Sequence, residues 1–386
     1  MIVGASFASW DLANSEQSNR FMESRVGRVR DSRSPDSLIV TLLVRLLTRR
    51  CAIMIKCNSV RIASSVTFAL CVLSLFSGEP ARADSDLAEF PPPGRLIEVD
   101  GHQRHLFCTG NGTPTVILEE GAGGGSLNWT WIQRKVAATT HVCSYDRPGY
   151  GWSDPSDTPR DAETVARELD ALLRSAGEQG PFIIVGHSLG GAYARMFASQ
   201  QRDNVAGLVL VDASSPSALT TMSEVGLPPI KKGAFSTFLA SNKILFQIAG
   251  WIGLVRVTID IDLNDLPPDA APAMRAFLLS HERARTAVRE LDFVSDTLHQ
   301  IGPLSGLGPT PVTVISSDRW IDKDPDLAAR RAEWNKKQQR NWLAISSNSR
   351  FLIVPGSDHL SLLSKKEHAA AVSDAIIQMV RGPRHR

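Results

Sequence analysis

The chain has 386 residues, of which 43% are apolar and 21% are charged, and its formal net charge at pH 7 is +2. This composition is typical of a water-soluble globular protein. No long acidic or basic block interrupts it, so we expect no nucleic-acid-binding surface.

The first 83 residues are predicted to lie outside the folded domain. From Met54 a short basic segment leads into the uncharged run 62–78 and then into a small-x-small site that ends at Ala83. This layout is typical of a secretory signal peptide over 54–83. We therefore expect cleavage after Ala83, a periplasmic or secreted protein, and a non-native or disordered extension over 1–53. A membrane anchor is the alternative, although a run of about seventeen residues with several serines is marginal for spanning a bilayer.

From Arg95 onward the apolar pattern predicts alternating strands and helices. Continuous apolar runs are typical of strands buried on both faces, and their alternation with helices predicts a parallel sheet wrapped by helices. The expected strands cover 95–99, 104–108, 115–119, 141–145, 182–185, 208–211, 312–315 and 351–354; the expected helices cover 129–138, 161–176, 191–198, 327–345 and 366–380.

Two cysteines, Cys108 and Cys143, lie beyond the expected signal peptide. In an exported protein such a pair can form a disulfide. Two buried free thiols are the alternative, because pairing requires Cα atoms within about 7 Å.

The regular alternation stops over 214–302, which divides the expected core into 90–213 and 303–386. The intervening segment is rich in Leu, Ile and Phe, and that apolar surface must be buried somewhere. A helical cap over the carboxyl edge of the sheet, lining an apolar pocket, is the favoured interpretation. An interfacial patch that contacts lipid is the less favoured one.

One pentapeptide, Gly186-His187-Ser188-Leu189-Gly190, stands between an expected strand and an expected helix. On so sharp a turn the serine adopts strained backbone geometry, and the flanking glycines let strand and helix pass without collision. The pattern therefore predicts that the Ser188 hydroxyl is presented as a nucleophile.

Three further motifs accompany this turn in a fixed order. They are Glu119-Glu-Gly121-Ala122-Gly123-Gly, Tyr145-Asp146-Arg147-Pro148-Gly149-Tyr150-Gly151-Trp152-Ser153 and Gly356-Ser-Asp-His359. Together with the Ser188 turn they resemble the α/β-hydrolase fold superfamily of esterases and lipases, from about Arg95 to the end. The resemblance implies a mostly parallel eight-stranded sheet with helices on both faces and a helical cap.

A serine hydroxyl needs an imidazole to accept its proton and a carboxylate to orient that imidazole. Among the histidines after Ser188, His359 alone follows an expected strand at the functional edge. The carboxylate is left open between Asp212, at the end of the sixth expected strand, and Asp318, after the seventh. Trp320 occupies the position where the superfamily usually has its acid.

The resemblance also implies that the backbone N–H groups of Ala122 and Leu189 form the oxyanion hole. The loop 145–153 is interpreted as a structural brace for the glycine turn. No phosphate-loop or dinucleotide fingerprint occurs, and no histidine or cysteine spacing suggests a metal site. We therefore expect no cofactor and no metal.

The predicted function is a serine hydrolase that cleaves an ester-like bond of a small or medium apolar substrate. Serine at the turn argues against dehalogenase or epoxide hydrolase chemistry, which uses a carboxylate nucleophile. The alternatives are a non-catalytic binding module on the same fold, and a membrane-surface lipase or acyltransferase.

Overall fold

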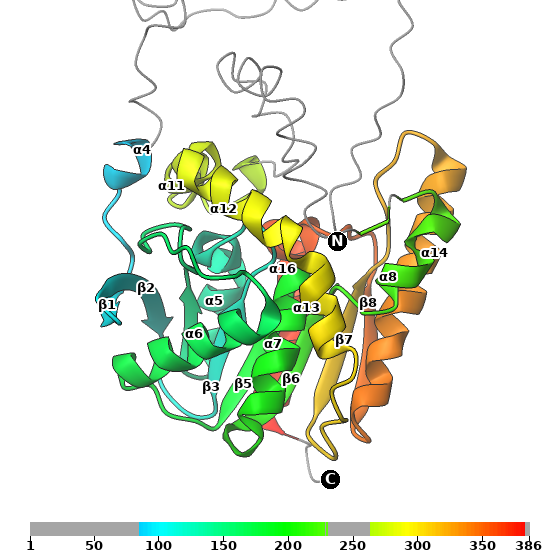
Figure 1. Cartoon of the computed structure of the whole chain (residues 1–386), viewed down its shortest axis with the longest axis horizontal. Helices are drawn as coiled ribbons and strands as arrows, with labels where there is room; N and C mark the ends of the chain where they lie inside the picture. Colours follow the sequence, from blue (N-terminus) through cyan, green and yellow to red (C-terminus); the bar gives the residue numbers. More distant parts are fainter. Residues whose placement is uncertain (1–84, 228, 231–262, 383–386) are drawn as a thin grey trace, which may run out of the picture. The chain divides into compact units, whose positions relative to one another are not determined.

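In the computed structural model of the chain, the described residues are 85–227, 229–230 and 263–382. The expected extension and signal peptide, and the central part of the expected cap, lie outside these residues (Figure 1). Among the residues that the structure describes, no helix is both long and apolar enough to cross a bilayer.

Within the described residues, eight strands form one sheet in the order β1-β2-β4-β3-β5-β6-β7-β8. The pairs β1–β2 and β2–β4 are antiparallel, and every other pair is parallel. The mostly parallel sheet predicted from the sequence is therefore confirmed. The strands are β1 (Arg95–Val99), β2 (His102–Thr109), β3 (Thr115–Glu119), β4 (Val142–Tyr145), β5 (Phe182–His187), β6 (Val205–Val211), β7 (Val312–Ser317) and β8 (Ser349–Val354).

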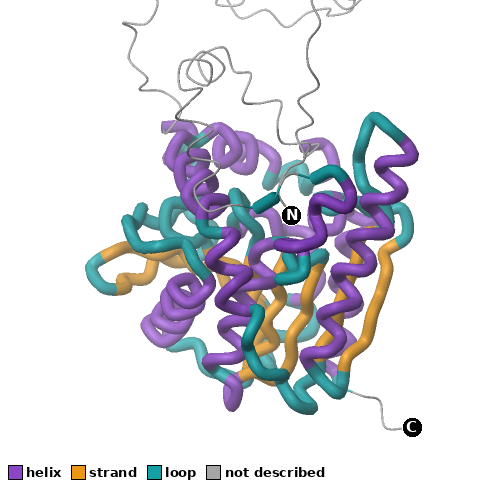
Figure 2. The backbone as a smooth tube through the Cα atoms, turned by 45° about the vertical axis from the view of Figure 1, so that its right-hand side comes forward, coloured by secondary structure: helices purple, strands orange, loops and turns teal. Residues whose placement is uncertain are grey.

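Helices cover both faces of the sheet (Figures 1 and 2). On one face α6, α7 and α13 share an apolar core with the strands, and on the other face α5, α15 and α16 do so. Strands β3, β5 and β6 are buried almost throughout, as continuous apolar runs predict. These helices are α5 (Thr130–Val136), α6 (Ala162–Ala176), α7 (Leu189–Gln200), α13 (Val294–Ile301), α15 (Ser361–Ser364) and α16 (Lys366–Arg381), and α14 (Pro325–Asn341) packs beside β7.

The described parts of 214–302 are largely helical. A third apolar cluster joins α11 to the 3-10 turn Ser126–Trp129 and to Tyr150, while α13 packs on α6 and α7. The limits of the cap as a separate domain stay a prediction. The remaining described elements are α4 (Ser85–Ala88), α8 (Ala218–Thr221), α11 (Ala271–Leu279) and α12 (His281–Asp292), with 3-10 turns at Ser126–Trp129, Arg202–Asn204, Met222–Val225, Leu263–Asp265 and Trp342–Ile345.

The register of the antiparallel pair β2–β4 decides the state of the two cysteines. Cys108 stands directly opposite Cys143, with their Cα atoms 4.0 Å apart, and the two are joined by a disulfide. Of the two alternatives left open by the sequence, the structure therefore has the cross-linked pair.

Candidate active site

Ser188 lies at the turn between β5 and α7, with φ 54° and ψ −125°. This left-handed φ is strained for a residue with a side chain. The turn is crowded, because a Cβ atom on Gly186 would lie 2.4 Å from the Gly190 carbonyl oxygen, and one on Gly190 would lie 2.4 Å from the Glu120 carbonyl oxygen. Both positions therefore require glycine.

His359, in the loop between β8 and α15, links Ser188 to Asp212. Its Nε2 lies 3.0 Å from the Ser188 Oγ, and its Nδ1 lies 2.7 Å from the Asp212 Oδ2. A carboxylate only accepts, so Nδ1 carries the proton and Nε2 is left to accept one from the hydroxyl. The three side chains come from the carboxyl ends of β5, β6 and β8, which meet at one edge of the sheet.

The Asp212 carboxylate is fully buried and satisfied by hydrogen bonds. Its Oδ1 accepts from the Ser317 N–H (3.0 Å) and from the Asn335 Nδ2 (2.7 Å), and its Oδ2 accepts from the Ser317 hydroxyl (3.0 Å) as well as from His359. Burial alone would raise the pKa of Asp212, but these donors outweigh it and lower the pKa to about 2. Asp212 therefore stays ionised at neutral pH.

Burial also acts on His359, but in the opposite direction, because here the charged form is the protonated one. Loss of hydration lowers the pKa of its imidazole from 6.5, and the hydrogen bond to Asp212 opposes part of that shift. The ring is consequently neutral at pH 7, so that its Nε2 can accept a proton.

Asp318, the other candidate acid, is not brought to His359. Its carboxylate, 37% exposed, accepts from the Gly356 N–H at 3.1 Å and lies 3.1 Å from the Lys336 Nζ. It stabilises the loop that leads to His359. Trp320, at the position where the resemblance expects an acid, packs edge-on against Trp334.

The glycine loop after β3 lies directly against Ser188. A Cβ atom on Gly121 would come 2.7 Å from the Ser188 Cβ and 3.3 Å from its Oγ, so the backbone of this loop lines the reactive hydroxyl. Ala122 is the next residue, and Leu189 begins α7, where helix N–H groups lack partners within the helix. Of the two expected oxyanion donors, Leu189 thus follows Ser188 in the chain, and Ala122 belongs to the loop that lies against Ser188 in space.

Arg147 holds the glycine loop from behind. Its buried guanidinium donates to the Glu120 carbonyl at 2.5 Å and to the Gly121 carbonyl at 2.7 Å, and pairs with the Glu119 carboxylate at 2.6 Å. The interpretation of 145–153 as a structural brace agrees with these contacts.

The same guanidinium binds helix α12. Its Nε and Nη2 donate to the two carboxylate oxygens of Glu290, on α12, at 2.7 and 3.0 Å. Tyr150 donates to Glu290 at 2.8 Å and accepts from the Gly123 N–H at 3.0 Å. Glu290 was not predicted from the sequence, because a contact across so many residues leaves no local pattern.

His187, within the pentapeptide, supports the His359 loop and was also missed. Its Nε2 donates to the His359 carbonyl at 3.0 Å, and its Nδ1 lies 2.9 Å from the Glu120 carboxylate. The two imidazole rings are 4.6 Å apart. His187 and Glu120 therefore connect the glycine loop to the loop that carries His359.

The described residues include a group of four possible metal ligands, away from Ser188: Cys108, His141, Cys143 and Glu178. It lies at the amino end of β4, whereas Ser188 follows the carboxyl end of the parallel strand β5. The expectation of no metal site stays a prediction, because two of these residues, Cys108 and Cys143, are joined in a disulfide.

A protein-family model with the description "Alpha/beta hydrolase family" matches residues 121–375, which is more than half of the chain. The chain belongs to the alpha/beta hydrolase family. An AB hydrolase superfamily protein of Gibberella zeae is 23% identical over 322 residues, covering 74% of this chain and 95% of that protein. An uncharacterized protein of Schizosaccharomyces pombe is 26% identical over 241 residues, covering 61% of this chain and 42% of that protein. The chain spans between 18% and 51% of the length of the first three curated relatives that it matches.

Solved structures of this family share the fold. The epoxide hydrolase CorEH has a TM-score of 0.54 at 19% identity, covering 73% of this chain and 96% of its own. The enol-lactonase from Burkholderia xenovorans LB400 has a TM-score of 0.51 at 15% identity, covering 75% of this chain and 100% of its own. A thermophilic esterase from Thermogutta terrifontis has a TM-score of 0.50 at 19% identity, covering 74% of this chain and 97% of its own. At these identities the likeness concerns the fold alone.

Proposed function

We propose that this alpha/beta hydrolase is a serine hydrolase that cleaves ester-like bonds of small or medium apolar substrates through an acyl-enzyme. The observation that carries the proposal is the chain of contacts from Asp212 through His359 to Ser188. A nucleophile, a base and an orienting carboxylate within hydrogen-bond reach are what acyl transfer to serine requires.

The proposed reaction has two halves. Ser188 Oγ attacks the carbonyl carbon while His359 Nε2 takes its proton, and the same proton then passes to the departing alcohol as the ester C–O bond breaks. In the second half His359 takes a proton from water, the resulting hydroxide attacks the acyl carbon, and Ser188 recovers its proton as the acid leaves. The backbone N–H groups of Ala122 and Leu189 stabilise the oxyanion in both halves.

The test compares Ser188→Ala with the parent protein on short-chain p-nitrophenyl esters, and labels both with a fluorophosphonate probe. Ser373→Ala is the matched control. It also removes a serine hydroxyl, but one that donates to the Ala369 carbonyl within helix α16. We expect Ser188→Ala alone to lose turnover and labelling. Retained ester turnover in that variant would overturn the proposal, and a parent protein that neither turns over nor labels would favour the non-catalytic binding module.

Ester turnover that rises sharply above the solubility limit of the substrate would instead favour a lipase acting at a membrane surface. The proposed periplasmic or secreted location rests on the sequence of 54–83, which lies outside the described residues.

A further inference from the structure

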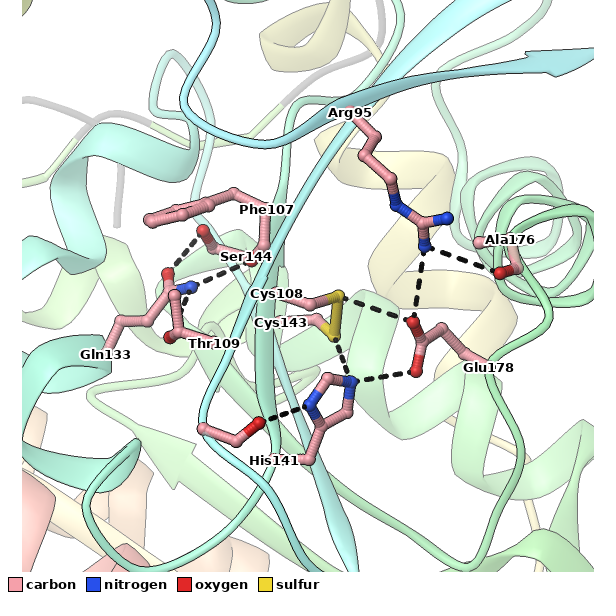
Figure 3. The surroundings of a disulfide bond; sticks show 11 residues. Arg95, Phe107, Cys108, Thr109, Gln133, His141, Cys143, Ser144, Ala176 and Glu178 are labelled. Carbon is pink, nitrogen blue, oxygen red and sulfur yellow. Dashed lines mark hydrogen bonds and ion pairs between the residues drawn. A yellow bond between two sulfur atoms is a disulfide. The ribbon is translucent and has the colours of Figure 1, made fainter.

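Four side chains converge around the disulfide, at the opposite end of the parallel strands from Ser188. Cys108 belongs to β2 and Cys143 to β4, His141 precedes β4, and Glu178 follows α6 (Figure 3). One sulfur, nitrogen or carboxylate oxygen from each lies within 4.8 Å of all the others. Three separate segments of the chain therefore bring sulfur, nitrogen and carboxylate oxygen donors to one point.

The hydrogen bonds of His141 fix which ring nitrogen faces this point. Nδ1 lies 3.0 Å from the Gly110 carbonyl, which can only accept, so Nδ1 carries a proton. Most histidines that bind a metal through one ring nitrogen donate the N–H of the other ring nitrogen to a carboxylate, a backbone carbonyl or water. Nε2 is then directed at the cluster, 3.6 Å from the Cys143 Sγ and 3.0 Å from the Glu178 Oε2.

The contact between His141 and Glu178 requires a positive centre. A ring nitrogen and a carboxylate oxygen at 3.0 Å repel each other unless a proton lies between them. While the disulfide is intact, a proton fulfils that need. A metal ion fulfils it equally, provided that the two sulfurs are free to become thiolates.

The cluster is reached by solvent from one side. The side chains of His141 and Glu178 are 25% and 14% exposed and Cys108 is partly exposed, whereas Cys143 is buried. Arg95 pairs with the other Glu178 oxygen, Oε1, at 3.6 Å, and so does not occupy the side that faces His141. The Cys108 Sγ also lies 3.6 Å from Oε1.

We propose that Cys108, Cys143, His141 and Glu178 form a two-state site, closed by the disulfide under oxidising conditions and binding one Zn²⁺ ion once a dithiol has reduced that bond. Two thiolates, one imidazole and one carboxylate are a donor set that Zn²⁺ takes in tetrahedral geometry. A soft thiolate pair disfavours Mg²⁺ and Ca²⁺, which take oxygen ligands.

The exchange balances in two steps. The dithiol gives two electrons and two protons to the Cys108–Cys143 bond and becomes a disulfide itself. Zn²⁺ then displaces the two thiol protons and the proton shared by His141 and Glu178. In both states β2 and β4 stay cross-linked, first by a covalent bond and then by the ion.

The experiment uses the full chain without a histidine tag, reduced anaerobically with dithiothreitol and then freed of it. Titration with Zn²⁺ is followed by calorimetry, and titration with Co²⁺ by absorption. We expect one ion per chain in the reduced protein, thiolate-to-cobalt charge-transfer bands, and no binding of either ion in the oxidised protein. Ester turnover is not needed as a readout, so this test stands or falls separately from the proposed hydrolase activity.

Two variants complete the test. Glu178→Gln keeps the shape of the side chain but removes a charged ligand, and we expect at least tenfold weaker Zn²⁺ binding with the same stoichiometry of free thiols. The Cys108→Ser and Cys143→Ser double variant should not bind. The proposal is overturned if the reduced parent protein takes up no more Zn²⁺ than the double variant, or if Glu178→Gln binds as tightly as the parent.

Discussion

The substitution Asp212→Asn tests the proposed catalytic chain most directly. It keeps the size of the side chain but replaces one carboxylate oxygen by an NH₂ group. The backbone N–H of Ser317 holds the remaining oxygen at the Oδ1 position, so the NH₂ group faces His359. His359 Nδ1 must then accept, its Nε2 carries the proton, and the ring no longer accepts a proton from Ser188.

The size of the expected effect follows from that change of tautomer. Holding the base in its inactive form costs about ten-thousand-fold in kcat, or about 5 kcal/mol of barrier. The stability effect is smaller. The fall in the pKa of Asp212 from 3.8 to about 2 corresponds to about 2 kcal/mol of folding free energy. A lowered carboxyl pKa stabilises the folded state above pH 3.8, and that contribution is lost as the pH falls toward 2, so the variant should remain folded at pH 7.

The assay is kcat/KM on p-nitrophenyl acetate, with circular dichroism to verify folding. Asp318→Asn is the matched control, because the Asp318 carboxylate is partly exposed and bonds to Gly356 and Lys336. We expect less than a threefold change from it. The reasoning is refuted if folded Asp212→Asn keeps more than a tenth of the parent activity, or if Asp318→Asn falls as far.

Three other predictions concern pH, crowding and the cross-link. First, kcat/KM should fall as the pH is lowered, with a midpoint below pH 6.5. Burial lowers the pKa of His359, and only its neutral form can accept the proton of Ser188. A midpoint at or above pH 6.5 would contradict this prediction. Second, Gly121→Ala should lose at least tenfold in kcat/KM, because its Cβ would come 2.7 Å from the Ser188 Cβ. Gly302→Ala, whose Cβ would make only ordinary contacts from 3.5 Å, should match the parent. Third, the Cys108→Ser and Cys143→Ser double variant should lose about 3 to 4 kcal/mol of unfolding free energy in denaturant titrations, because the disulfide closes a loop of 35 residues. Equal denaturation midpoints for the oxidised parent and the double variant would contradict this prediction.

The sequence predicted the sheet and the sharp turn at Ser188 because both leave local patterns. Continuous apolar runs mark strands buried on two faces, and the glycines around Ser188 mark a turn where a Cβ would collide. The prediction for His359 rested on position, since a loop after a late strand reaches the same edge as Ser188.

What the sequence left open depended on backbone geometry and long-range register. Asp212 turns toward His359 because its own φ is 46°, a conformation that no periodicity predicts. The pairing of Cys108 with Cys143 required the register of β2 on β4. Glu290 contacts Arg147 across a gap of 143 residues, so neither residue signals the other in the sequence.

The buried pair of Arg147 and Glu290 joins α12 to the glycine loop beside Ser188. Both side chains are almost fully enclosed, and separating them would leave unpaired charges in the interior at a cost of about 3–5 kcal/mol. Helix α12 and the glycine loop should therefore keep the same relative position while the rest of the fold is intact.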